Sequence, residues 1–140
     1  MTAGPTTPQR RRTTVESRLA LFEEATAIVA FEYPDRLELD ALARRLATSP
    51  RQLQRAFNEA GQTGFRTYLR SVRMERAEEL LREGSLRVNE VAEAVGYSQP
   101  AQFAKAFRRH HGHAPSALRA AAERGVDNST DSQQHRREGG

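Results

Sequence analysis

Two segments of the chain carry arginine, lysine and amide side chains at the three- and four-residue spacing of a helix face. The segments begin at Pro50 and Pro100, and each has an apolar face on its other side. The outward positions are Arg51, Gln54, Arg55 and Asn58 in the first segment, and Ala101, Gln102, Lys105, Arg108 and Arg109 in the second. Arginine can hydrogen-bond to guanine O6 and N7, glutamine to adenine, and a small apolar group can contact a thymine methyl. The two faces therefore suit the reading of base edges.

An internal repeat favours this interpretation over an ordinary solvated helix face. The apolar positions of Leu39–Leu46 recur in Val88–Val95, 49 residues later. The residues that recur 50 positions later are Pro50, Leu53, Arg55 and Phe57, matched by Pro100, Phe103, Lys105 and Phe107. The additional residue falls in the turn between the two helices of the second copy. Each copy reads as a short helix, a tight turn and a second helix, so the sequence predicts two helix-turn-helix motifs.

The elements that must position these faces are all helical. We expect an all-α fold of about seven helices, with apolar residues at helical spacing and proline or glycine at the helix ends. The expected organisation is a disordered tail over residues 1–14, a folded body over 15–122 and a second disordered tail over 123–140. Within the body, the two motifs are expected over about 39–60 and 88–110.

A linker helix is expected between the motifs, over about residues 64–83. At 1.5 Å per residue such a helix is on the order of 30 Å long. Successive major-groove segments on one face of DNA lie about 34 Å apart. One chain could therefore place two recognition helices one turn of DNA apart.

Composition narrows the classes of protein that fit. The 140 residues include 22 basic and 18 acidic residues, and Lys105 is the single lysine among the basic ones. The absence of cysteine excludes disulfide scaffolds, thiolate zinc sites and cysteine nucleophiles. No apolar run approaches the roughly 20 residues of a membrane helix, so a cytoplasmic protein without a membrane partner is expected.

No catalytic or metal-binding constellation stands out in the sequence. The chain has no phosphate loop, nucleophile elbow or paired-carboxylate site, so neither an enzyme nor a cofactor is expected. The cluster of His110, His111 and His113 has no carboxylate at ligand spacing and no cysteine partner. These histidines are expected at the surface or in contact with phosphate, and no metal site is expected.

The sequence resembles the DNA-binding domain of the AraC/XylS family of bacterial transcription regulators. The resemblance covers about Val15 to Arg119. It is carried by Leu39–Ala43, by Ser49–Phe57, by Tyr68–Leu81, and by Val91-Ala92, Gly96-Tyr97, Phe103, Phe107-Arg108, Gly112, Pro115-Ser116 and Arg119. It implies seven helices in two homeodomain-like halves joined by a rigid helix. Four positions depart from the family pattern: Gly64, Arg87, Gln99 and Leu118.

The family resemblance also implies which side chains contact DNA. The residues expected to read bases are Arg51, Gln54 and Arg55 in the first motif, and Ala101, Gln102 and Lys105 in the second. Backbone or secondary contacts are expected from Ser49, Gln52, Asn58, Ser98, Gln99, Arg108 and Arg109. The second face has fewer base-reading side chains than the first. Our hypothesis is that the first motif discriminates between sequences and that the second mostly anchors the DNA backbone.

The expected function is sequence-specific binding of double-stranded DNA by a bacterial, nucleoid-associated regulator. The family mostly activates transcription, which implies RNA polymerase as a partner. Two alternatives are a module that binds DNA without sequence preference, or binds another protein, and the DNA-binding fragment of a larger effector-sensing regulator. A small-molecule effector is expected only if such a further domain exists.

Overall fold

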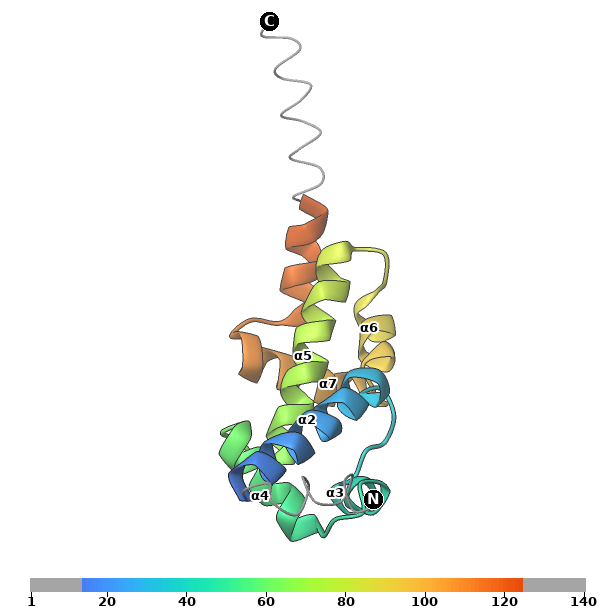
Figure 1. The fold of residues 1–140 in the computed structure, drawn as a ribbon. Coiled ribbons are helices and arrows are strands. Elements are labelled where there is room, and N and C mark those ends of the chain that lie inside the picture. The colour runs from blue at the N-terminus through green and yellow to red at the C-terminus, as the bar shows by residue number, and fades with distance from the viewer. Residues whose placement is uncertain (1–13, 125–140) are drawn as a thin grey trace, which may run out of the picture. The chain divides into compact units, whose positions relative to one another are not determined.

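The computed structural model describes residues 14–124, and the two predicted tails lie almost wholly outside this range. The described residues form seven helices and no strand (Figure 1). The helices are α2 (Thr14–Glu32), α3 (Leu39–Arg45), α4 (Pro50–Ala60), α5 (Phe65–Glu83), α6 (Val88–Ala94), α7 (Pro100–His111) and a last helix over 115–124. The predicted all-α fold is confirmed.

The chain divides into two compact units between Leu69 and Arg70, within α5. The first unit contains α2, α3, α4 and the start of α5. The second contains the rest of α5, α6, α7 and the last helix. Each unit holds one helix-turn-helix motif, α3 with α4 and α6 with α7, and the two helices of each motif pack against each other.

Aromatic rings form the core of the first unit. The Phe57 ring of α4 lies 5.3 Å from the Phe22 ring of α2, and 5.4 Å from the rings of both Phe65 and Tyr68 on α5. A Cβ atom at Gly61 would come within 2.7 Å of the Phe22 ring, so the end of α4 can approach α2 only because this residue lacks a side chain. This packing turns the apolar side of α4 inward and leaves its polar side outward.

The second unit has a matching aromatic core. Phe103 and Phe107 of α7 are fully buried, and their rings lie 5.8 Å apart. Tyr97, in the turn between α6 and α7, places its ring 5.7 Å from Phe103. Val91 and Val95 complete the buried side of the motif. The position of Phe107 corresponds to that of Phe57, so both second helices are anchored in the same way.

Local signals set the ends of the two equivalent helices. The Ser49 hydroxyl accepts a hydrogen bond of 3.1 Å from the backbone N–H of Gln52, and Pro50 stands in the first turn of α4. Pro100 occupies the same place in α7, where the Gln99 side chain makes no capping hydrogen bond. Gly112 ends α7 in the left-handed conformation with φ of 84°.

Candidate nucleic-acid interface

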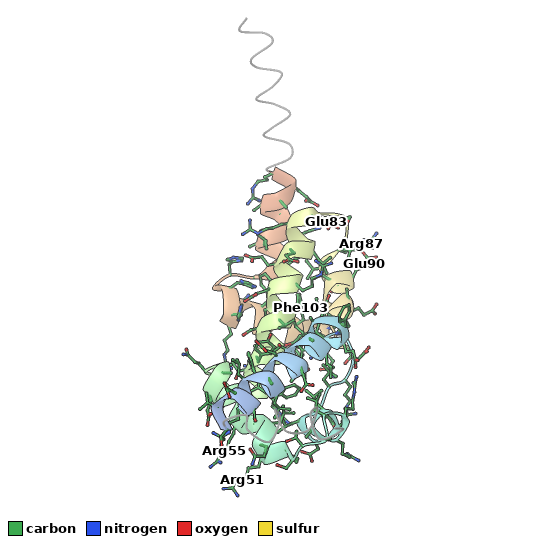
Figure 2. The ribbon with its side chains drawn as sticks, in the orientation of Figure 1. Arg51, Arg55, Glu83, Arg87, Glu90 and Phe103 are labelled. Carbon is green, nitrogen blue, oxygen red and sulfur yellow. The ribbon has the colours of Figure 1, made fainter. Side chains whose placement is uncertain are left out.

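The outward face of α4 carries two exposed arginines one helical turn apart, Arg51 and Arg55. In Figure 2 both side chains extend from α4 away from the ribbon. The opposite face of the helix is fully buried through Leu53, Ala56 and Phe57. Since the buried face is held in the core of the first unit, the two arginines are presented to solvent on a fixed support.

Gln54 lies differently from the two arginines. Its side chain is half-buried, and a Cβ atom at Gly64 would come within 2.8 Å of its Nε2 atom. The Gln54 amide therefore lies over the backbone of the turn between α4 and α5. Gly64, one of the departures from the family pattern, leaves the space that this amide occupies.

The outward face of α7 corresponds to that of α4. Ala101, Gln102 and Lys105 are exposed, while Phe103 and Phe107 are buried on the other side. A shallow open groove runs along the helix and is lined by Ala101, Ala104, Lys105, Arg108 and Arg109. The two alanines give this surface an apolar part that can contact a thymine methyl group. The three basic side chains give it a positively charged part that can contact phosphates or base edges.

Electrostatic pairing distinguishes these faces from the other charged surfaces. Arg45 donates hydrogen bonds of 2.7 and 2.8 Å to the Glu32 carboxylate, which raises the pKa of Arg45 and lowers that of Glu32. Arg82 pairs with Glu78 at 3.1 Å. Within residues 14–124, no ion pair includes the basic residues of the two faces, Arg51, Arg55, Lys105, Arg108 and Arg109. Their charges are available to a phosphate or a base.

The residues predicted to make secondary contacts lie at the starts and outer sides of the two helices. They are all exposed: Ser49, Gln52, Asn58, Ser98, Gln99, Arg108 and Arg109. The Ser49 hydroxyl is already engaged as the cap of α4. The structure thus places the candidates of the first motif together on α4 and those of the second together on α7. Among the base-reading candidates, Gln54 differs because its side chain is half-buried over Gly64.

Arg73 supports the second motif from α5. Arg73 of α5 lies with its guanidinium carbon 5.8 Å from the centroid of the Tyr97 ring, a cation–π distance. Burial lowers its pKa, with Tyr97 acting in the opposite direction. The contact holds the turn before α7. Because Arg73 and Tyr97 lie far apart in the chain, no local periodicity indicates it.

The histidine cluster is only partly at the surface. His110 and His113 are exposed, but His111 is largely buried, and its Nε2 donates a hydrogen bond of 2.9 Å to the Met74 carbonyl oxygen. The His111 ring lies 4.4 Å from that of Phe107. The expectation of a surface role is therefore wrong for His111, which attaches the end of α7 to α5. Among the described residues, no group of three potential ligands is placed to hold a metal ion.

None of the described helices is both long enough and apolar enough to span a membrane.

Comparison with known proteins places the chain in a family. Residues 42–121 match a protein-family model described as a helix-turn-helix domain. The HTH-type transcriptional regulator GlxA of Rhizobium meliloti is 37% identical over 123 residues, which make up 84% of this chain and 37% of that protein. A transcriptional regulator from Chromobacterium violaceum, described as AraC-type, has a TM-score of 0.69 at 27% identity, covering 74% of this chain and 92% of that one. The chain belongs to the AraC/XylS family.

AraC/XylS membership confirms the resemblance inferred from the two motifs. The family is one of transcriptional regulators and not of enzymes. A further structural neighbour, the DNA-binding domain of the global transcriptional factor AdpA, was solved in complex with a target DNA. It has a TM-score of 0.68 at 29% identity, covering 71% of this chain and 90% of that one. The chain spans little more than a third of the length of GlxA.

Proposed function

We propose that this chain binds double-stranded DNA sequence-specifically through α4 and α7 and so regulates transcription. The observation that carries the proposal is the pair of equivalent helices whose aromatic faces are buried and whose outward arginines and lysine form no ion pair in the described structure. An unneutralised arginine on a supported helix can form the two parallel hydrogen bonds that guanine accepts in the major groove. The AdpA complex supports the proposal by analogy.

The roles of individual side chains follow from their chemistry. Arg51, Gln54 and Arg55 of α4 are proposed to read bases, as are Ala101, Gln102 and Lys105 of α7. The remaining exposed polar residues of the two motifs are proposed to contact the backbone. Because α4 carries two arginines and α7 only one lysine among its candidate readers, we propose that the first motif supplies most of the sequence discrimination.

At a larger level, we propose that residues 15–122 act as one DNA-binding domain, with α4 and α7 in successive major-groove segments. The family mostly activates transcription, so recruitment of RNA polymerase in the cytoplasm of a bacterium is the proposed outcome. A small-molecule effector would act only through a further domain, such as the longer relatives have room for.

The Arg55→Ala variant tests the proposed reading role of α4. A binding site is first selected from random DNA with the wild-type chain, and affinities are then measured for duplexes changed one base pair at a time. Arg55→Ala is expected to cost about 1–3 kcal/mol of binding free energy and to remove discrimination at one base position. The same duplexes show whether the half-site read by α4 is the more sensitive one.

Two further variants serve as controls for Arg55→Ala. Arg109→Ala, a proposed backbone contact, is expected to weaken binding to all duplexes alike and to reduce the salt dependence. Arg76→Ala removes a charge that is paired with Glu79 at 2.7 Å on α5 and is expected to leave discrimination unchanged. If the selected site does not outcompete random DNA, and Arg55→Ala weakens all duplexes equally, the chain binds DNA by backbone charge alone.

A further inference from the structure

An ion pair joins the first helix of the described chain to the base-reading helix of the first motif. Arg18 of α2 donates a hydrogen bond through Nη1 to the Glu59 carboxylate of α4. The Arg18 side chain is 19% exposed and that of Glu59 is 45% exposed, so the arginine approaches the carboxylate from the packed side. Both residues belong to the first unit, in which α2 packs against α4.

The same carboxylate lies one helical turn beyond Arg55. Residues four apart on a helix are neighbours on its surface, and an arginine and a glutamate at this spacing commonly pair. The pKa of Glu59 lies below its ordinary value of 4.5, first because of the hydrogen bond from Arg18 and then because of the positive charges of Arg18 and Arg55, while partial burial acts in the opposite direction. The charge of Arg55 therefore acts on this carboxylate, but it is Arg18 that donates the hydrogen bond to it.

We propose that Arg18 is a positioning residue for DNA recognition, which occupies Glu59 and so keeps the guanidinium of Arg55 available to a base. The inference rests on the proposed function of α4. An arginine held by its own helix neighbour must break that pair before it can bind guanine, and the loss reduces its affinity. An arginine that starts unpaired makes the same contact without that cost.

The alternative role for Arg18 is purely structural, because an ion pair between two helices also helps to hold them together. The two roles differ in what they predict for each partner. Under a structural role, losing either residue breaks the pair, and any extra loss from the more buried Arg18 is not relieved by also removing Glu59. Under a positioning role, loss of Arg18 weakens DNA binding and loss of Glu59 does not, since only the loss of Arg18 leaves a free carboxylate beside Arg55.

The test compares Arg18→Gln, Glu59→Gln, the double variant and Arg55→Ala, using a labelled duplex that carries the site selected by the wild-type chain. Arg18→Gln is expected to weaken binding on the order of threefold to fivefold, the upper part of the range of a surface ion pair acting as competitor. Glu59→Gln is expected to stay within about twofold of the wild type. The double variant is expected to regain most of the affinity, because it lacks the competing carboxylate.

Thermal unfolding of each variant supplies the readout for the structural role. Arg18→Gln and Glu59→Gln are expected to lower the unfolding temperature similarly, although only the first weakens binding. When Arg55 is already alanine, adding Arg18→Gln is expected to have little further effect on binding.

Three results would overturn the inference. Equal weakening by Arg18→Gln and Glu59→Gln would show a structural role alone, and unchanged binding by Arg18→Gln would show that Arg18 has no influence on Arg55. A double variant that stays as weak as Arg18→Gln would mean that Arg18 acts through its own packing or through a DNA contact, and not by occupying Glu59. If Arg55→Ala leaves binding unchanged, the proposed reading role of α4 is wrong and the inference fails with it, a result distinct from the other three.

Discussion

A single missing side chain decides where Gln54 lies. The amide of Gln54 occupies the space that a Cβ atom at Gly64 would fill, with its Nε2 atom 2.8 Å from that position. Neighbouring Arg51 and Arg55 extend into solvent instead. The proposed reading face of α4 therefore combines two side chains that extend into solvent with one whose position depends on the following turn.

The Gly64→Ala variant is expected to change base preference with little effect on stability. A methyl group at residue 64 would displace the Gln54 amide, which is the far end of a flexible side chain and can move at small cost. Selection of sites from random DNA should then give a preference that differs from the wild type at the same base position that Gln54→Ala affects. An unchanged preference would show that the amide leaves Gly64 whenever DNA binds.

The turns of the two motifs each contain a residue in the left-handed backbone conformation, but the residue type differs. Gly96 follows α6 with φ of 98°, in the left-handed region where glycine carries no penalty. The equivalent residue after α3 is Ala47, with φ of 54°. A left-handed conformation costs a residue with a Cβ atom roughly 1–2 kcal/mol. The first motif thus carries strain that the second does not.

Exchanging these two turn residues is expected to have opposite effects. Ala47→Gly should stabilise the protein by about 0.5–1 kcal/mol, because relief of the strain exceeds the added entropy of the unfolded chain. Gly96→Ala should destabilise it by about 1–2 kcal/mol for the converse reason. Urea denaturation of the two variants measures both changes. A loss of stability in Ala47→Gly would contradict the strain assigned to this turn.

Carboxylates paired with arginine occur in both units, and each pair contributes to the free energy of unfolding in the same direction. The pKa values of Glu32, Glu59 and Glu78 lie below their ordinary value of 4.5, in each case first because an arginine donates a hydrogen bond to the carboxylate: Arg45, Arg18 and Arg82 respectively. Desolvation acts in the opposite direction at all three. The described chain therefore combines paired acidic residues with outward faces of α4 and α7 whose basic residues form no ion pair.

These lowered pKa values predict loss of stability in acid. Because the unfolded chain takes up protons at a higher pH than the folded chain does, the stabilisation is complete above about pH 4.5 and is lost as pH falls through the folded pKa values. Urea midpoints measured from neutral pH to well below 4.5 should show this decline. Glu32→Gln should lower the midpoint at neutral pH and reduce its dependence on pH. A midpoint independent of pH would contradict the pairing.

The sequence alone determined the helices, their ends and the two helix-turn-helix motifs. These follow from interactions between residues at most a few positions apart, such as the Ser49 hydroxyl on the Gln52 N–H, the proline that starts α7 and the periodic burial of Phe103 and Phe107. The repeat made the assignment specific, because two copies of one pattern constrain each other. The candidate reading faces followed from the same periodicity.

Only the tertiary structure decided which charged side chains pair between separate helices. Arg18 meets Glu59, Arg45 meets Glu32 and His111 meets the Met74 carbonyl because separate helices pack side by side, at sequence distances where no periodicity applies. The position of Gln54 over Gly64 depends in the same way on how the chain turns after α4. The sequence shows that Arg55 lies on a polar face. The packing of α2 on α4, which no periodicity of the sequence indicates, is what brings Arg18 to the Glu59 carboxylate one helical turn from Arg55.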